Sequence, residues 1–433
     1  MIRADLVVVD AAQMLTLKGP APRTRDALRD LSIIPGGCLA AREGRLVFVG
    51  TRDAFEAEVS LDDAAEIIDA SDQVVMPGFV DAHTHLPFAG SREKEFAQRL
   101  AGTSYREIAA AGGGIMSTVR ATRAAGDEEL LDIVLRRMDR MLLEGVTSCE
   151  AKSGYGLTLE HELRLLKVLR RAAGAHPLQI TATFLGAHTV PVEFADNREA
   201  YIELVVGSMI PAVAKERLAR YCDVFCEQGA FSLDESRRVL TAGAAAGLIP
   251  RLHADQLTGN GGAELAAELH AASADHLEHA SDDGLKMMAA AGVPAVLLPG
   301  ASLCMMQEVW APARRMVEAG VAPVLATDLN PGTSYTESMG LMVALGCLRM
   351  GLTAEEAIAA ATINPAVTIG RQDVIGSLEP GKQADLIVLE ASDYRFLPYR
   401  PGVNLVGTVV KEGEVVVRER RIVYQEPGEE LIS

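Results

Sequence analysis

The chain contains the stretch Val74-Val75-Met76-Pro77-Gly78-Phe79-Val80-Asp81-Ala82-His83-Thr84-His85, in which an apolar strand leads directly into His-x-His. Side chains along a strand repeat every two residues, so we expect His83 and His85 to point to the same side. At the C-terminal end of a barrel strand that side is the mouth, where barrel enzymes keep their sites. Two imidazoles there could chelate a metal, although an isolated His-x-His more often marks a partly exposed strand end.

Three later apolar segments also end in residues that bind metals. His253 follows Ile249-Pro250-Arg251-Leu252, His276 follows Ser273-Ala274-Asp275, and Asp328 follows Val324-Leu325-Ala326-Thr327. Three imidazoles and one carboxylate suit Zn²⁺ or Fe²⁺ and leave room for a water molecule. A divalent ion lowers the pKa of such a water and polarises a carbonyl, so the pattern predicts hydrolysis or deamination.

The rest of the chain predicts a large α/β barrel and a small β domain. Helical stretches alternate with short apolar strands over about 300 residues, which suits a (β/α)₈ TIM-like barrel. Short strands with turn signals at Glu43-Gly44 and Glu412-Gly413 dominate both ends of the chain. We therefore predict residues 1–75 and 376–433 as the two parts of a β-sandwich domain, and residues 76–375 as the barrel.

Composition narrows the classes of partner. The 433 residues carry a net charge of -18, which speaks against nucleic acid and requires a local cation for any anionic substrate. Six scattered cysteines indicate a reducing cytosol, and the N-terminus lacks a signal peptide. The uncharged stretch from Met287 to Met306 contains glycines and prolines, so we predict a helix end, a buried strand and a loop rather than a membrane span. A soluble cytoplasmic protein is expected.

Longer motifs extend the pattern from residue 70 to residue 390. They read PGFVDAHTHLPFAGSRE from Pro77, EAKSGYGLT from Glu150, FLGAHTVP from Phe184, LHADQLTGNGGAELA from Leu252, SADHLEHAS from Ser273, LATDLNPGTSYTESM from Leu325 and LEPGKQADLIVLE from Leu378. His-Thr-His and GKQADL mark only the amidohydrolase superfamily. The other motifs are more specific, and together they resemble the imidazolonepropionase family of that superfamily.

The resemblance implies a role for each site residue. One divalent metal ion, zinc or iron, would be held by His83, His85, His253 and Asp328. Arg92 would bind the propionate of a small anionic substrate, Tyr155 would help to hold that substrate, His188 and Gln256 would contact its ring and amide groups, and Asn330, Gly332 and Thr333 would line the opposite wall. His276 would lie close to the metal without binding it. There it could stabilise an oxyanion or move protons.

The implied reaction opens the ring amide of 4-imidazolone-5-propanoate to give N-formimidoyl-L-glutamate, in a homodimeric enzyme of the cytoplasm. Asp328 and His276 are the candidate catalytic residues, and either could be the general base, because Gln256 cannot accept a proton in that role. Another cyclic amidohydrolase or a heterocycle deaminase would use the same metal cage. Only a propionate-bearing ring needs a cation such as Arg92. A non-catalytic metal-binding paralogue would be expected to have lost a ligand.

Three further features have more than one interpretation. Lys152 could be a carboxylated lysine that bridges two metals or a charged support for the Ser153–Gly156 loop; we favour the loop support, because one metal already has a full ligand set. Cys222 and Cys226 are predicted as buried core thiols. The segment Ala301–Met306 is less aromatic than expected for the family, which could reshape the pocket.

Overall fold

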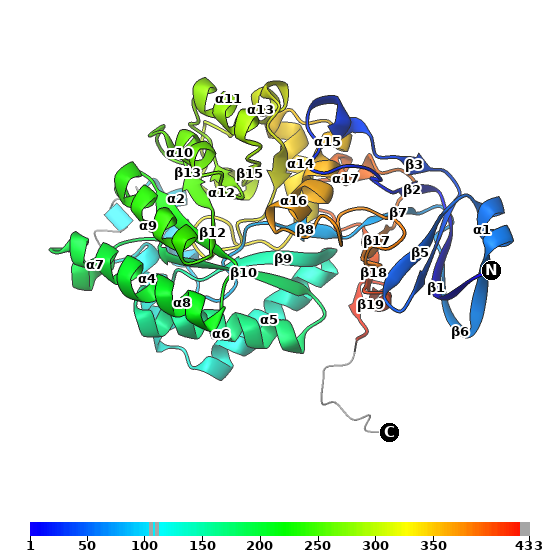
Figure 1. Ribbon diagram of the computed structural model, residues 1–433, viewed down its shortest axis with the longest axis horizontal. Helices are drawn as coiled ribbons and strands as arrows, with labels where there is room; N and C mark the ends of the chain where they lie inside the picture. Colours follow the sequence, from blue (N-terminus) through cyan, green and yellow to red (C-terminus); the bar gives the residue numbers. More distant parts are fainter. Residues whose placement is uncertain (104–106, 109–111, 425–433) are drawn as a thin grey trace.

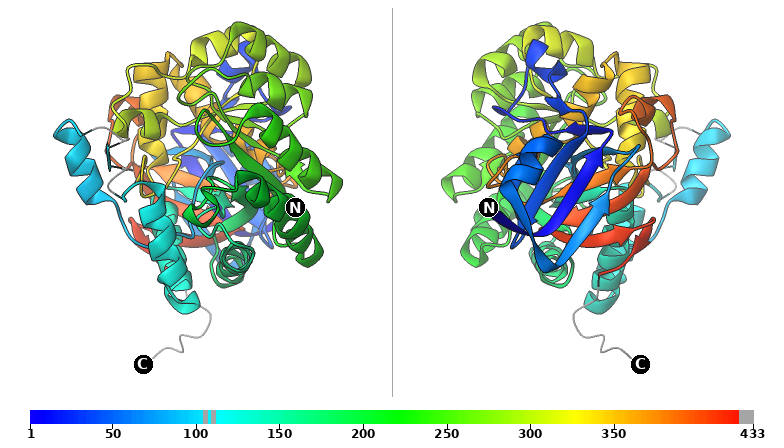
Figure 2. Two further views of the ribbon diagram at one scale, coloured as in Figure 1. Left: turned by 90° about the vertical axis from the view of Figure 1, so that its left-hand side faces the viewer. Right: turned by 90° about the vertical axis from the view of Figure 1, so that its right-hand side faces the viewer.

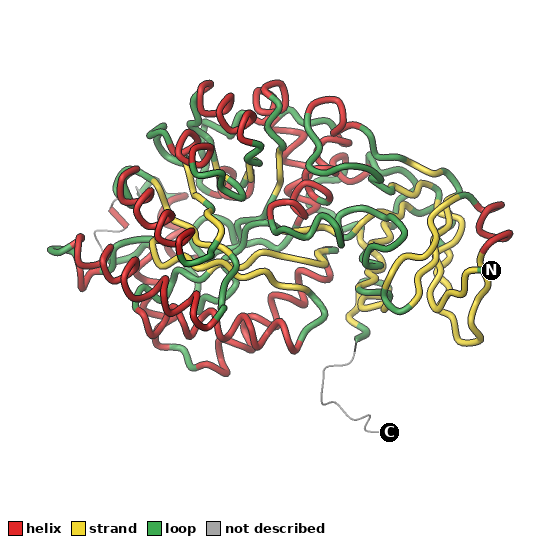
Figure 3. The backbone as a smooth tube through the Cα atoms, viewed as in Figure 1, coloured by secondary structure: helices red, strands yellow, loops and turns green. Residues whose placement is uncertain are grey.

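The computed structural model, which describes residues 1–103, 107–108 and 112–424, consists of a barrel and two further sheets (Figure 1). The barrel and its helices occupy one end of the molecule, and the two sheets built from the chain's ends occupy the other. In Figure 3 the helices surround the strands of the barrel, whereas the opposite end is formed mainly by strands.

Eight positions around the barrel are filled by parallel strands. They are β8 (Phe79–Asp81), β9 (Val146–Lys152), β10 (Gln179–Ala187), β11 (Tyr221–Cys226), the paired segments β12 (Ile249–Pro250) and β13 (Leu252–Ala254), β14 (Ala274–His276), β15 (Ala295–Leu297) and β16 (Pro323–Leu325). Beyond the last regular strand, Thr84 pairs with Leu329, so the chain after β8 meets the chain after β16. The predicted (β/α)₈ TIM-like barrel is confirmed.

Amphipathic helices cover the barrel. They are α4 (Ile115–Ala124), α5 (Asp127–Leu143), α6 (Leu159–Ala175), α7 (Arg198–Leu204), η3 (Val205–Met209), α8 (Ile210–Glu216), α9 (Leu233–Ala245), α10 (Gly262–Glu268), α11 (Asp282–Ala291), α12 (Pro299–Cys304), α13 (Ala313–Ala319), α14 (Met339–Met350), α15 (Ala354–Ala361) and α16 (Ile363–Thr368). A further helix, α2 (Glu93–Leu100), has no buried residue. In α5, Leu130, Val134, Met138 and Met141 recur every three or four residues and are buried, which places one apolar stripe against the barrel.

The uncharged stretch from Met287 to Met306 contains the predicted helix end and buried strand, but its last part is helix α12 rather than a loop. Pro299 stands at the first position of that helix, where its fixed φ favours a helix start. Among the described residues, no helix is long and apolar enough to cross a membrane. Cys222 and Cys226 of β11 are buried free thiols in the core, as predicted.

Two sheets form the second part of the molecule. The first has the order β5 (Arg45–Gly50), β4 (Gly37–Arg42), β1 (Ile2–Ala11) and β6 (Val59–Asp69). The second has the order β20 (Arg421–Ile422), β19 (Glu414–Arg418), β18 (Val406–Lys411), β17 (Leu386–Leu389), β7 (Val74–Pro77), β2 (Gln13–Leu15) and β3 (Ile33–Ile34). The short helices η1 (Arg25–Arg29), α1 (Arg52–Glu58) and α17 (Phe396–Tyr399) complete this part.

The two sheets share a core, because side chains alternate along each strand. Leu6 and Val8 of β1 pack with Leu386 and Val388 of β17, whereas Val7 faces a separate cluster on the other side of the first sheet. Figure 2 shows the blue N-terminal strands lying against the red C-terminal strands. The predicted sandwich of N- and C-terminal segments is thus confirmed as a fold.

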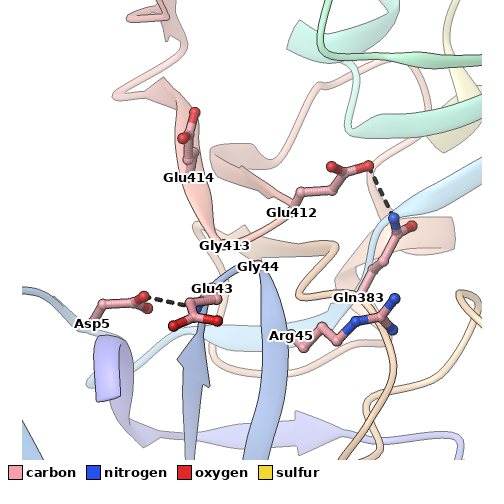
Figure 4. A pocket seen from close by; sticks show the side chains of 8 residues that line it. All are labelled: Asp5, Glu43, Gly44, Arg45, Gln383, Glu412, Gly413 and Glu414. Atoms are coloured by element: carbon pink, nitrogen blue, oxygen red, sulfur yellow. Dashed lines mark hydrogen bonds between the residues drawn. The ribbon is translucent and has the colours of Figure 1, made fainter. Parts of the chain in front are cut away.

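The two predicted hairpin turns meet at a small cavity of about 420 Å³ (Figure 4). Both turns have positive φ at their two central residues, with values of 49° and 77° at Glu43-Gly44 and 50° and 79° at Glu412-Gly413. Such pairs of positive φ match the twist of the flanking strands. The remaining lining residues are Asp5, Arg45, Gln383 and Glu414, so the cavity belongs to the contact between the two sheets and not to the barrel mouth.

The stretch Val74–Asp81, expected as one strand, is divided between two sheets. β7 pairs with β17 and β2, whereas β8 pairs with β9 of the barrel. Gly78 separates them: its N–H donates to Asp385 O at 3.1 Å, and the next N–H donates to Gly145 O at 2.9 Å. A Cβ at Gly78 would lie 2.4 Å from Cγ2 of Thr147, so only glycine allows this close crossing.

We predict that Gly78→Ala destabilises the protein by about 1–3 kcal/mol, because the added methyl group overpacks a rigid site between two strands. Urea denaturation would measure the loss, and Thr147→Ala in the same chain should restore part of it. Gly174→Ala is the matched control, since Gly174 lies in α6 with open space around it and alanine favours a helix. Equal stability of the Gly78 variant and the wild type would refute the crowding.

Candidate metal centre

The predicted site residues lie at or just after the C-terminal ends of the barrel strands. His83 and His85 follow β8, Tyr155 follows β9, His188 follows β10, His253 and Gln256 come from β13 and its loop, His276 ends β14, and Asp328, Asn330, Gly332 and Thr333 follow β16. Only Arg92 lies further on, immediately before α2. Residues separated by more than 240 positions therefore share one face of the barrel.

Three imidazoles form the centre of this face. His83, His85 and His253 are buried, and one nitrogen from each lies within 4.8 Å of the others. The ring of His83 lies 4.6 Å from that of His253 and 5.3 Å from that of His85. Nε2 of His83 and Nε2 of His253 are buried without a hydrogen-bond partner. Because a buried polar atom normally has a partner, this geometry fits a metal ion.

Asp328 lies beside the three imidazoles and offers a fourth donor. Its Oδ1 lies 3.4 Å from Nε2 of His83 and 3.5 Å from Nε2 of His85. These distances are long for hydrogen bonds, but ligand atoms about 2.0–2.1 Å from a tetrahedral ion lie about 3.4 Å from one another. Oδ2 accepts a hydrogen bond from Oγ1 of Thr333 at 3.3 Å, which leaves Oδ1 directed to the imidazoles. The donor set therefore suits one divalent ion.

Two buried carboxylates orient two of the imidazoles. Nδ1 of His83 lies 2.6 Å from Oδ2 of Asp275, and Nδ1 of His253 lies 3.0 Å from Oδ1 of Asp223. An ionised carboxylate only accepts, so each Nδ1 carries the proton and each Nε2 keeps its lone pair for a metal. Burial lowers the pKa of His253 to about 4, so that ring is neutral at pH 7.

A layer of buried charge lies beneath these groups. Nζ of Lys152 lies 2.8 Å from Asp223, 2.9 Å from Glu150 and 3.6 Å from Asp275, and all four side chains are fully buried. Arg251 lies 3.5 Å from Asp275 and donates to Ala82 O at 2.9 Å. One ammonium group thus contacts both carboxylates that orient the imidazoles.

These charges keep the acids ionised. Burial alone would raise the pKa of Asp275, but Arg251 and Lys152 outweigh it and hold that pKa far below its ordinary value. Burial likewise opposes ionisation of Asp223, and the neighbouring His253 and Lys152 lower its pKa. The pKa of Lys152 is raised despite its burial by the carboxylates around it. In this structure Lys152 therefore has the contacts of an ammonium group within an ion-pair layer.

Aromatic rings flank the imidazoles on one side. His188 stacks on His85 with ring centroids 5.2 Å apart, and Tyr155 lies 5.3 Å from His188. Nδ1 of His188 lies 3.0 Å from Gly154 O, so Nδ1 carries a proton and Nε2 is an acceptor. Burial, with the neighbouring His85 and His253, lowers the pKa of His188 and keeps the ring neutral. The loop of Tyr155 is fixed by Glu162, which accepts three backbone N–H groups.

Arg92 packs against the turn on the opposite side. Its Nε donates to Glu95 at 2.7 Å, and a Cβ at Gly332 would lie 2.2 Å from its Nη1. The amide of Asn330 accepts the N–H groups of Gly332 and Thr333 at 2.8 Å each and donates to Asp328 O at 2.6 Å. Asn330 therefore shapes the turn that carries Asp328.

His276 and Gln256 complete the face. The ring of His276 lies 5.4 Å from that of His253 and 5.8 Å from that of His83. Its backbone has a φ of 79°, followed by 69° at Leu277, a conformation that L residues adopt at a cost. Gln256 is buried beside Asp255, whose carboxylate accepts the N–H groups of Asn260, Gly262 and Ala263. The structure thus brings every predicted site residue to one face.

The ion-pair layer formed by Lys152 and its neighbours was not predicted from the sequence. Glu150, Asp223 and Asp275 stand within strands, Arg251 lies between β12 and β13, and all four side chains are fully buried. Charged residues are almost never fully buried unless they are paired. Their presence in strands such as Tyr221–Cys226 was therefore a signal that could have revealed the layer.

A family model described as the amidohydrolase family matches residues 74–416. The chain is therefore an amidohydrolase, one of a superfamily of metal-dependent hydrolases. Among curated relatives, the imidazolonepropionase of Symbiobacterium thermophilum is 49% identical over 419 residues, which cover 96% of this chain and 98% of that protein. The imidazolonepropionase of Geobacillus kaustophilus is also 49% identical, covering 96% of this chain and 99% of its own. That of Myxococcus xanthus is 47% identical, covering 96% and 98%. The chain belongs to the imidazolonepropionase family.

Solved structures of lower identity share the fold. An adenosine deaminase from Xanthomonas campestris with bound zinc has a TM-score of 0.74 at 18% identity, covering 98% of this chain and 95% of its own. A triazine hydrolase variant has a TM-score of 0.73 at 15% identity, covering 97% and 96%. At such identities the likeness describes the barrel with its added sheets and says nothing about the substrate.

We predict that Lys152→Met lowers metal affinity about 10- to 100-fold, because the carboxylates that orient His83 and His253 lose their shared cation. The free energy of unfolding should fall by about 3–5 kcal/mol, since unpaired buried charges remain. Chelator competition and urea denaturation measure the two effects.

Two further variants test whether the charge balance is responsible. Combining Lys152→Met with Glu150→Gln removes one charge of each sign and should restore part of the stability. Lys286→Met, which breaks the exposed ion pair with Asp283, should leave metal affinity unchanged. Full metal affinity in the Lys152 variant would contradict the role of the layer.

Proposed function

We propose that this chain hydrolyses the ring amide of 4-imidazolone-5-propanoate and releases N-formimidoyl-L-glutamate. The observation that carries the proposal is the combination of a metal cage with a cation on the opposite wall. His83, His85, His253 and Asp328 form the cage, and Arg92 is the cation. The family relationship over 96% of the chain supports the same reaction.

The metal that fits the cage would be one zinc or iron ion, because three imidazoles and one carboxylate accept either. When bound, it would polarise the ring carbonyl and bring the pKa of a water molecule toward neutrality. Metal analysis of the purified protein would distinguish the two ions.

The residues of the site account for the proton transfers and the bond cleavage. Asp328 accepts a proton from the attacking water, whose oxygen forms a bond to the ring carbonyl carbon. Nε2 of His276 accepts a hydrogen bond from the second proton of that water and so holds its oxygen toward the carbonyl carbon. The carbonyl carbon–nitrogen bond then breaks, and the proton held by Asp328 passes to the leaving nitrogen. Water is added across one bond, so the step needs no other reactant.

Substrate contacts follow from the donors and acceptors around the cage. Nε2 of His188 is an acceptor and suits a ring N–H, whereas Gln256 both donates and accepts. Arg92 would hold the propionate through its planar guanidinium, which pairs well with a carboxylate. In a chain of net charge -18, an anionic substrate requires such a fixed cation.

The direct test is to follow the absorbance of freshly made 4-imidazolone-5-propanoate with metal-loaded protein. Loss of absorbance, formation of N-formimidoyl-L-glutamate and inhibition by a chelator are expected. If the metal-loaded protein leaves this compound intact, its substrate is instead another cyclic amide or heterocycle.

Asp328→Asn is expected to nearly abolish turnover with the fold intact, because an amide cannot accept the proton from water. Steady-state kinetics with this variant, at matched metal content, would measure the loss. Retention of more than about a tenth of the activity would remove Asp328 from the role of proton acceptor.

Gly332→Ala is expected to raise KM about tenfold or more, because its methyl group would displace the guanidinium of Arg92. Gly340→Ala is the matched control, since the nearest atom to its added Cβ lies 4.0 Å away. KM for the propionate-bearing substrate should change in the first variant only. Equal KM values in both variants would show that Arg92 does not bind the propionate.

A further inference from the structure

Glu278 is a buried acid beside the site that the proposed reaction leaves without a role. Its side chain is 1% exposed, and it lies two residues beyond His276. Oε1 accepts a hydrogen bond from Oγ of Ser302 in α12 at 2.9 Å. Oε2 is buried and has no hydrogen-bond partner. No cation among the described residues forms an ion pair with Glu278 apart from the imidazole of His276.

Other buried acids of this protein have the contacts expected of structural groups. Glu162 accepts the N–H groups of Gly154, Gly156 and Leu157, and Glu227 accepts those of Leu257 and Thr258. Each holds a loop by hydrogen bonds that compensate for burial. Within the described part of the chain no backbone N–H donates to Glu278, so fixing a loop there does not explain its burial.

The carboxylate of Glu278 faces a possible hydrogen-bond donor, the imidazole of His276. Nδ1 of His276 lies 3.9 Å from Oε1 of Glu278, and this nitrogen is also buried without a hydrogen-bond partner. The imidazole of His276 and the carboxylate of Glu278, each with a buried atom that lacks a hydrogen-bond partner, therefore face each other. A small rotation of either side chain would bring the two within hydrogen-bond distance. The rings of His83 and His253 lie 5.8 and 5.4 Å from the imidazole of His276.

Two other imidazoles of the site are oriented by a carboxylate in this way. Asp275 and Asp223 each take the Nδ1 proton of an imidazole and so fix its tautomer and orientation. The carboxylate of Glu278 faces Nδ1 of His276 in the same way, but at the longer distance of 3.9 Å. The left-handed backbone at His276 and Leu277 turns the chain sharply at this point, so that residues 276 and 278 can approach each other.

We propose that Glu278 is a positioning residue that accepts a hydrogen bond from Nδ1–H of His276 and directs Nε2 of that imidazole, as an acceptor, to the attacking water. Ser302 holds the carboxylate in place. The proposal rests on the proposed function, because it concerns how His276 serves that reaction. It predicts one defined tautomer of His276 in the metal-loaded protein, with the proton on Nδ1.

Three variants of Glu278 test the proposal. Glu278→Ala should lower kcat about 10- to 100-fold, while KM and metal content stay within about twofold of the wild type. Glu278→Gln keeps an acceptor of the same shape but loses the charge, and should fall between alanine and the wild type. Glu278→Asp restores the charge on a shorter stem and should recover part of kcat.

A spectroscopic measurement reports on the imidazole directly. Nitrogen-15 NMR of histidine-labelled, zinc-loaded protein distinguishes the two tautomers, and the signal of His276 is identified by its loss in His276→Asn. The Nδ1–H tautomer is expected in the wild type, and a mixture of tautomers is expected in Glu278→Ala. Glu356→Gln is the matched control, because Glu356 is a fully buried acid that pairs with Arg29 and Arg314. Its loss should lower stability without changing kcat or the His276 signal.

The outcomes separate this proposal from the proposed function. Unchanged kcat in Glu278→Ala, or an unchanged His276 signal, would overturn the role of Glu278. Loss of metal from the variant would also overturn it, since the carboxylate would then act on the cage. If the wild type fails to open 4-imidazolone-5-propanoate, the proposed function fails, and the tautomer of His276 alone decides whether Glu278 positions that ring.

Discussion

The ion pairs between Lys152 and the carboxylates of Asp223 and Asp275 are the interaction on which the site depends. A metal cage needs imidazoles that present Nε2, and the two carboxylates fix this orientation by accepting the Nδ1 protons of His83 and His253. Buried carboxylates are costly without a cation, and a buried cation is equally costly without carboxylates. The closed interior of a parallel barrel, where neighbouring strands end at one level, brings these groups within reach of one another.

Above this layer, the loops of the site are held by two acids and one amide that bind backbone rather than metal. Glu162 fixes the loop of Tyr155, Asp255 fixes the loop after Gln256, and Asn330 forms the turn that carries Asp328. Each polar side chain satisfies several N–H groups at once, so the loops keep their shape without regular secondary structure. The pocket walls are consequently as well defined as the strands beneath them, which suits recognition of a small, polar substrate.

Local patterns in the sequence predicted the barrel, the sandwich and a group of imidazoles and a carboxylate at the strand ends, whereas the choice of four metal donors came from the resemblance to the family. The two-residue repeat places His83 and His85 together, and strand ends in a parallel barrel meet at one face. The charged layer depends on which residues face each other across strands, and that register is not visible in one strand alone. His253 reaches Asp223 only because β11 and β13 pair in one particular register, with Phe225 opposite His253. The division of Val74–Asp81 was hidden for the same reason, since β17, the partner of β7, is more than 300 residues away.

The passage of the chain through Gly78 joins the two parts of the molecule mechanically. β7 is anchored in the sandwich, and within ten residues the same backbone delivers two imidazoles to the cage. The sandwich cannot separate from the barrel without pulling on His83 and His85. By linkage, an ion that binds only the folded cage also stabilises the sandwich that tethers it. The small domain, which contributes no donor atom of its own, thus becomes part of the thermodynamic unit that retains the metal.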